Sequence, residues 1–153
     1  MKTLCSIEIA PNPPSEFKGV RVARLAITRC NQQGETEVLL AKNIKKKEWE
    51  LPGGQLEPWE CKAVGVAREV GEEVNGVVII QSGFVKYLSY TMVGGARHGL
   101  PYEAHVARGE DIGGHIYAKS EVEDTQWVVT EAVPHIPNLR PDVIPAMTAV
   151  SLL

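Results

Sequence analysis

Three acidic side chains lie close together in one stretch of predicted helix: Glu69, Glu72 and Glu73. Residues three and four apart are neighbours on a helix surface, so these carboxylates converge, and each like-charged pair costs roughly 0.2–0.5 kcal/mol. One interpretation is an ordinary solvated face whose repulsion is softened by Arg68 or Lys62. The other is a binding site for a hard cation, because magnesium is typically held by a few carboxylates together with substrate phosphates.

The residues around these acids follow a spacing that chance does not explain. Gly54 is followed after five residues by Glu60, and after seven more by the run Arg68-Glu69-Val70-Gly71-Glu72-Glu73. Six such fixed positions arise by chance in a chain of this length on the order of once in 10⁵ sequences. The segment resembles the signature of the Nudix hydrolase superfamily, Gly-x5-Glu-x7-Arg-Glu-U-x-Glu-Glu-x-Gly-U, in which U is a bulky aliphatic residue.

The end of the signature departs from the family pattern, because Asn75 and Gly76 stand where the family has Gly-U. Asparagine is the residue other than glycine that best tolerates a left-handed backbone. We therefore expect the helix to stop at Asn75 or Gly76, and the acids before it are unaffected.

The resemblance implies a metal-dependent enzyme that cleaves a diphosphate bond. It implies that Glu69, Glu72 and Glu73 act in catalysis and bind Mg²⁺ or Mn²⁺, with the backbone carbonyl of Gly53 as a further ligand. The small Gly54 also lets the backbone come close to phosphate and metal.

Glu60 and Arg68 are expected to organise this site. Eight residues along a straight helix span ~12 Å, so a direct ion pair between the two requires Glu60 to lie in the incoming loop.

The general base is a separate question, because relatives draw it either from the signature helix or from a later loop. Glu121, six residues before Trp127, is the best later candidate. Other acids compete with it, and an acid in an exposed loop is often merely solvated. These competitors are Glu103, Glu110, Glu123 and Asp124.

Residues outside the signature would hold the substrate. Arg24 and Lys42 are candidate phosphate contacts, and Trp49 and Tyr90 could stack on a base, although large aromatic residues usually pack in a core. The first expectation is hydrolysis of a nucleoside or deoxynucleoside triphosphate by water attack on phosphorus. Alternatives are ADP-ribose, nucleotide-sugar or dinucleoside polyphosphate hydrolysis, an isoprenoid diphosphate enzyme, and a nucleotide-binding sensor without turnover.

Hydrophobic periodicity predicts the elements that position these residues. Strands over Val20–Cys30 and Glu37–Ala41 should form a hairpin through Gly34. A helix from near Glu60 to Asn75 should bury a stripe of apolar residues; the stripe is Ala63, Val66, Ala67, Val70 and Val74. Further strands are predicted over 77–80, 85–90, 102–106 and 126–130, and a closing helix over 142–153. Strands around one strong helix favour an α/β/α sandwich with a central mixed sheet.

The whole chain sets outer limits on function. Its 153 residues suit a single domain over 1–153, and the net charge of −3 with a pI near 5.8 argues against a nucleic-acid surface. Cys5, Cys30 and Cys61 lack zinc-ligand spacing and favour reduced thiols in the cytoplasm. No run of ~18 apolar residues predicts a membrane span. The expected partner is a small nucleotide, and whether the chain acts alone or as a homodimer stays open.

Overall fold

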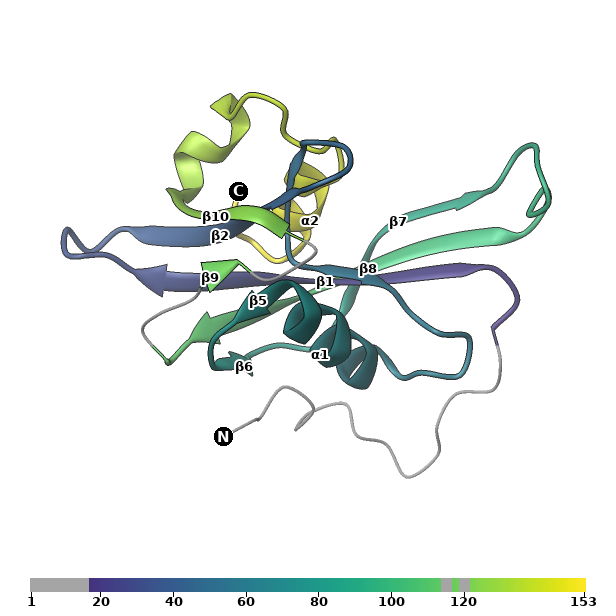
Figure 1. The fold of residues 1–153 in the computed structure, drawn as a ribbon, viewed down its shortest axis with the longest axis horizontal. Helices are drawn as coiled ribbons and strands as arrows, with labels where there is room; N and C mark the ends of the chain where they lie inside the picture. The colour runs from purple at the N-terminus through teal and green to yellow at the C-terminus, as the bar shows by residue number, and fades with distance from the viewer. Residues whose placement is uncertain (1–16, 114–116, 119–121) are drawn as a thin grey trace.

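The computed structural model describes residues 17–113, 117–118 and 122–153, which build a mixed β-sheet with helices on both faces (Figure 1). The strands are β1 (Val20–Cys30), β2 (Thr36–Asn43), β3 (Trp49–Glu50), β4 (Gly53–Gln55), β5 (Val74–Asn75), β6 (Val78–Ile80), β7 (Val85–Thr91), β8 (Pro101–Asp111), β9 (Tyr117–Ala118) and β10 (Val122–Val129). The helices are α1 (Lys62–Glu73), the 3₁₀ helix η1 (Thr130–His135) and α2 (Val143–Ala149). In this part of the chain, no helix is long and apolar enough to cross a membrane.

Strand β1 is the centre of the sheet. The main strand order is β10-β2-β1-β8-β6, with β3, β4 and β7 added to β2, β1 and β8 respectively. β1 runs parallel to β8 and antiparallel to β2 and β4. The β1–β2 hairpin confirms the predicted one, and its turn contains Gly34 at a φ of 79°, a conformation that glycine adopts without a steric penalty.

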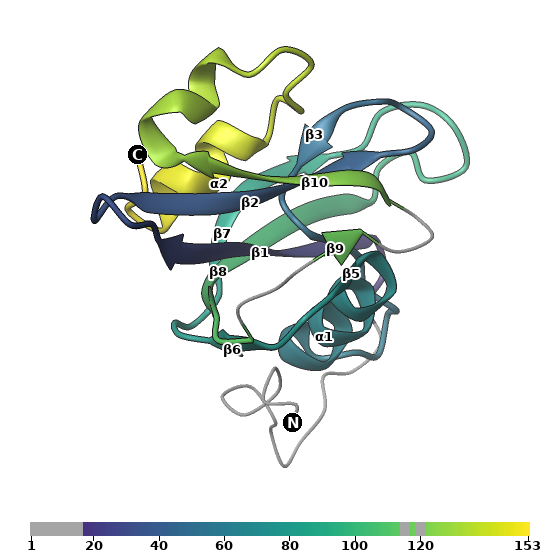
Figure 2. The same ribbon diagram turned by 60° about the vertical axis from the view of Figure 1, so that its left-hand side comes forward.

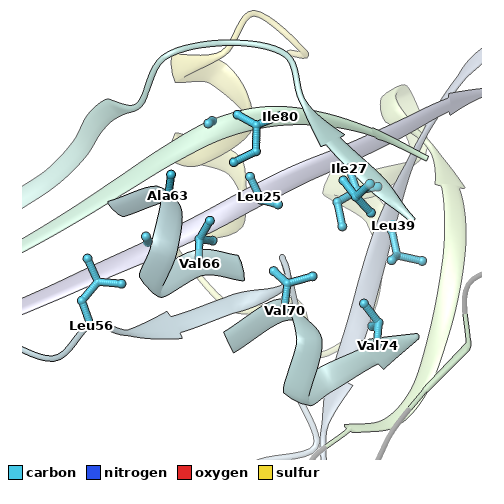
Figure 3. Close-up of a cluster of buried hydrophobic side chains, with 12 residues drawn as sticks. Leu25, Ile27, Leu39, Leu56, Ala63, Val66, Val70, Val74 and Ile80 are labelled. Carbon is cyan, nitrogen blue, oxygen red and sulfur yellow. The ribbon is translucent and has the colours of Figure 1, made fainter. Parts of the chain in front are cut away.

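The alternation of side chains along β1 separates two apolar cores. Leu25 and Ile27 point to the α1 face, where the predicted stripe of α1 packs against them (Figure 3). Ala26 belongs to the core on the other face, which α2 covers. Figures 1 and 2 show α1 and α2 on opposite sides of the sheet, which confirms the α/β/α sandwich with a mixed sheet.

The end of α1 differs from the prediction. The helix stops at Glu73, and Val74 is already extended, with a φ of −136° and a ψ of 155°. Neither Asn75 nor Gly76 has a positive φ, so the expected left-handed stop is wrong. The physical reason is that Val74 is buried in the apolar core between α1 and the sheet, while the segment Val74–Asn75 pairs with β9.

Other boundaries also differ. β8 extends five residues beyond the predicted Val106, to Asp111, because its second half pairs with β6. The closing helix is shorter than predicted and covers only Val143–Ala149. The segment Pro52-Gly53-Gly54 leads into a short strand, β4, which pairs with β1 and so brings the glycines against the centre of the sheet.

Candidate active site

The segment Leu51-Pro52-Gly53-Gly54, which we call the glycine loop, lies in close contact with both β1 and α1. Gly53 has a φ of 141°, and a Cβ there would clash with the carbonyl oxygen of Ala23. A Cβ on Gly54 would clash with the Glu69 carboxylate. Gly53 therefore requires glycine, because a side chain there would meet backbone atoms of β1, whereas a side chain at Gly54 would displace the Glu69 carboxylate.

Glu73 is the buried member of the acidic group, with only 8% of its surface exposed. Its Oε1 accepts a 2.8 Å hydrogen bond from the Gly53 amide, which joins the end of α1 to the glycine loop. Burial raises the pKa of Glu73 to about 8, against the opposing effects of the Gly53 amide and Arg24. Nearby Glu50 and Glu69 add to the increase.

Arg68 connects the other acids. Its guanidinium forms a two-pronged pair with Glu60, from Nε to Oε2 at 3.0 Å and from Nη2 to Oε1 at 2.7 Å. Its Nη1 contacts Glu69 Oε1 at 2.9 Å and Glu72 Oε1 at 3.1 Å. The hydrogen bonds from Arg68 lower the pKa of Glu60. Glu60 precedes the first residue of α1, so the prediction that this ion pair needs Glu60 in the incoming loop is confirmed.

The donor atoms around the glycine loop suit a hard divalent cation. All are oxygens, from Glu69, Glu72, Glu73 and the Gly53 carbonyl, and Mg²⁺ and Mn²⁺ prefer oxygen ligands. The repulsion that Glu73 experiences from Glu50 and Glu69 is one that a bound cation would offset. The residues present therefore fit magnesium or manganese.

The described residues do not form a finished metal cage. Among them, no group of three His, Cys, Asp or Glu side chains has metal-binding geometry. The contacts explain why. Glu69 and Glu72 are held on the Arg68 guanidinium, Glu73 lies on the Gly53 amide, and the Gly53 carbonyl accepts from Arg24 Nη1 at 3.3 Å.

Arg24, predicted as a phosphate contact, is buried on β1 with 5% exposure. Its Nη1 donates to the carbonyls of Leu51 at 3.0 Å and Gly53 at 3.3 Å, and lies 3.5 Å from Glu50 Oε2. In this arrangement the guanidinium holds the glycine loop from the α2 side of the sheet.

A buried polar network extends from Arg24, and sequence reasoning missed it. Glu50 Oε1 lies 3.4 Å from Arg140 Nη1, Arg140 Nε lies 3.0 Å from Asp142 Oδ1, and the Tyr87 hydroxyl donates to Asp142 Oδ2 at 3.0 Å. The one local signal was the acid placed directly before Leu51-Pro52-Gly53-Gly54. Nothing in the sequence indicates that Arg140, 90 residues further along, is its partner.

The remaining predicted substrate residues lie outside this acidic group. Lys42 Nζ lies 3.4 Å from Glu123 Oε2 and 5.8 Å from the centroid of the Trp49 ring, and Glu123 also pairs with Lys47. Trp49 packs against the α2 core. Tyr90, half exposed, stacks on Tyr102 with ring centroids 4.7 Å apart.

The acids proposed as alternatives for the general base are dispersed. Glu121 lies outside the described residues. Glu103 pairs with Lys86 on the β7–β8 hairpin, and Glu110 accepts a hydrogen bond from Gln81. Both are held by partners of their own.

Comparison with known proteins gives a consistent assignment. The model of the NUDIX domain matches residues 19–149 of the chain. A search of curated proteins finds no match.

Solved structures resemble the chain over most of its length. The Nudix hydrolase RenU from M. Smegmatis has a TM-score of 0.70 at 15% identity, covering 91% of each chain. An Ap4A hydrolase from C. elegans has a TM-score of 0.65 at 21% identity, covering 83% of this chain and 92% of its own. A MutT protein from Methanosarcina mazei Go1 has a TM-score of 0.61 at 24% identity, covering 86% of this chain and 91% of its own. At these identities the structures establish the fold.

Proposed function

The chain belongs to the Nudix family and is a Nudix-type pyrophosphohydrolase, and from this premise we propose that it hydrolyses a nucleoside or deoxynucleoside triphosphate with Mg²⁺ or Mn²⁺. The observation that carries the proposal is the grouping of three carboxylates on α1, of which those of Glu69 and Glu73 adjoin the glycine loop. Glu73 is fixed by the Gly53 amide, and Glu69 and Glu72 are fixed by Arg68. The reaction consumes water, breaks one bridging P–O bond of the diphosphate, and yields two phosphate products.

Each residue of the site has a distinct role in this proposal. Glu69, Glu72 and Glu73, with the Gly53 carbonyl, would hold the metal, which when bound supplies positive charge to the phosphate oxygens and acidifies a water. Arg68 orients two of the carboxylates, and Glu60 orients Arg68. The small glycine loop lets the phosphates approach the backbone.

The proton of the attacking water goes to a carboxylate. The general base is either one of the acids of α1 or Glu121, which lies later in the sequence. A Glu121→Gln variant separates these roles. If Glu121 is the base, the variant loses most of its kcat but binds Mn²⁺ like the wild type.

The choice of a nucleoside triphosphate rests on a cation and aromatic rings that lie outside the acidic group. Lys42 beside Trp49 and the exposed stack of Tyr90 on Tyr102 offer a cation and aromatic surfaces to a nucleotide. The similarity to an Ap4A hydrolase keeps dinucleoside polyphosphates as the second candidate. ADP-ribose and nucleotide sugars complete the set to be tested.

A substrate panel tests the proposal. Wild-type protein is incubated with NTPs, dNTPs, dinucleoside polyphosphates, ADP-ribose and nucleotide sugars in Mg²⁺ or Mn²⁺, and products are quantified by chromatography. The Glu73→Gln variant serves as the inactive reference, and Glu131→Gln, an exposed acid on η1, as the matched control. We expect wild type and Glu131→Gln to hydrolyse a nucleoside triphosphate. Glu73→Gln should hydrolyse none of the compounds. Tight binding of a nucleotide without turnover of any compound would instead identify a sensor.

A further inference from the structure

Helix α1, which carries the acids, begins without the usual stabilising features. Its N-cap residue is Cys61, in an extended conformation and without a side-chain capping hydrogen bond, and its first turn contains no acidic residue. A helix start normally has its free amides satisfied by a capping side chain, or an acid near its positive end. The loop that precedes this helix start is therefore a natural place to look for contacts that hold it.

Arg21 holds that loop from strand β1. The side chain is buried, and its Nη2 donates to three backbone carbonyls of the loop: Glu57 at 3.0 Å, Pro58 at 3.3 Å and Glu60 at 2.7 Å. The backbone of Arg21 contributes as well, since its carbonyl accepts a 2.8 Å hydrogen bond from Leu56. The loop is thus attached to the central strand through both the main chain and the guanidinium of a single residue.

The loop in turn determines where Glu60 lies. Glu60 Oε1 accepts hydrogen bonds from the Glu57 amide at 2.8 Å and from Arg68 Nη2 at 2.7 Å. Close packing supports this arrangement, because a Cβ on Gly65 would clash with Leu56 and would come within 3.2 Å of Glu60 Oε1. A displaced loop would therefore carry the Glu60 carboxylate away from Arg68.

We propose that Arg21 is a positioning residue for the metal-binding carboxylates, acting through Glu60 and Arg68. The chain of contacts runs from Arg21 to the Glu60 carbonyl, from the Glu60 carboxylate to Arg68, and from Arg68 Nη1 to Glu69 and Glu72. Arg21 touches neither the acids of α1 nor the glycine loop among the contacts of the described residues. This inference rests on the proposed function for its catalytic consequence, but its structural step can be tested without any activity.

Three variants separate the contributions of Arg21. Arg21→Met keeps an apolar stem of similar length and removes all donors, whereas Arg21→Lys keeps one cationic donor group that cannot present the planar guanidinium. Arg29→Met is the matched control, because Arg29 lies on the same strand but pairs with Glu37 and Trp127 instead. Thermal unfolding confirms that each variant is folded before further measurement.

The first readout is the NMR signal of the Arg68 Nε–Hε group in metal-free protein, since this N–H donates to Glu60 at 3.0 Å. In wild type and Arg29→Met we expect a protected signal. In Arg21→Met its exchange with solvent should be at least about tenfold faster, with Arg21→Lys between the two, because exchange reports local opening. An unchanged Arg68 signal in folded Arg21→Met would overturn the proposal.

The second readout is Mn²⁺ affinity, measured by EPR without substrate, together with steady-state kinetics on the substrate found in the panel. Loss of a group that orients metal ligands typically reduces metal affinity or activity about 10–100-fold. We expect Arg21→Met to weaken Mn²⁺ binding at least about tenfold and to lower kcat with little change in KM, and Arg21→Lys to recover part of both. If wild type binds no Mn²⁺ while the Arg68 signal responds to Arg21→Met, the proposed function fails and the Arg21 linkage stands.

Discussion

Arg68 is the residue on which the candidate site depends, because one guanidinium contacts three carboxylates. The planar fork makes a paired contact with Glu60 while its remaining nitrogen reaches Glu69 and Glu72. Its surroundings raise the pKa of Arg68 above the ordinary arginine value, chiefly through the hydrogen bond to Glu60, so it stays charged. A lysine ammonium carries the charge but not this geometry.

The Arg68→Lys variant tests that distinction. We expect kcat on the panel substrate to fall about 10–100-fold, because the carboxylates proposed to bind the metal lose their orientation, with a smaller change in KM. Arg29→Lys is the control and should retain wild-type kcat, since Arg29 lies far along β1 beside Glu37. Equal kcat for Arg68→Lys and wild type would show that charge alone suffices.

The buried His105 should make the stability of the fold depend on pH. It is buried on β8, and burial lowers the pKa of its imidazole to about 4, with Lys62, Lys86 and Arg21 adding to the decrease and Glu103 opposing it. The unfolded chain therefore binds a proton at a higher pH than the folded chain does. Stability should fall as the pH drops from about 6.5 towards 4.

The measurement is the free energy of unfolding in urea at pH 7.5 and pH 5. The wild type should lose about 1–2 kcal/mol more than His105→Gln over this interval, because the glutamine cannot titrate. Identical losses in the two proteins would mean that His105 is protonated as easily in the fold as in the unfolded chain.

Helix α1 combines a buried apolar stripe with an acidic face. Its two internal glycines differ in how much space a side chain would find around them. A Cβ at Gly71 would meet nothing within 4 Å, whereas one at Gly65 would clash with Leu56 and approach Glu60. The same substitution should therefore have opposite effects at two positions six residues, or about 1.7 turns, apart.

We expect Gly71→Ala to stabilise the protein by about 0.5–1 kcal/mol, because alanine reduces the entropy lost on helix formation. Gly65→Ala should destabilise it by about 1–3 kcal/mol, because the added methyl group overpacks against Leu56 in the loop that precedes α1. Urea unfolding of both variants checks the signs. A stabilised Gly65→Ala would show that Leu56 moves aside without cost.

Local patterns predicted those parts of the fold that depend on neighbours in sequence. The stripe of α1 and the β1–β2 hairpin could be found because periodicity and turn residues are local properties. The end of α1 could not, because Val74 is drawn into a strand by pairing with β9, far along the chain. The acids, the glycines and the Glu60–Arg68 pair followed from one contiguous signature. The Glu50–Arg140 pair did not, since only the folded sheet brings these residues together.

At the scale of the molecule, the sheet separates an acidic surface on α1 from a polar network under α2, and the glycine loop contacts both. Glu73 holds the loop from the α1 side, and Arg24 holds it from the other. Glu50 joins Arg24 to Arg140 and so connects the loop to the segment that leads into α2. The position of the loop therefore depends on packing on both faces.

Glu50→Gln should show this dependence. Removing one charge of a buried pair leaves Arg24 incompletely compensated, a change that typically costs about 3–5 kcal/mol, and the glutamine amide should recover part of this. The neighbouring, only partly buried Glu48 provides the control: Glu48→Gln should change stability by less than about 0.5 kcal/mol. If urea unfolding gives the two variants equal stability, the network contributes nothing to the fold.

Under the proposed function, a divalent metal held by the acids of α1 drives hydrolysis of a nucleotide diphosphate bond. The most direct test is the initial rate of hydrolysis of the panel substrate as a function of Mg²⁺ concentration, for wild type, Glu72→Gln and Glu131→Gln. We expect saturable, EDTA-sensitive activity in wild type and Glu131→Gln, and at least about a 100-fold loss in Glu72→Gln. Hydrolysis that persists in EDTA, or that Glu72→Gln leaves unchanged, would contradict the account.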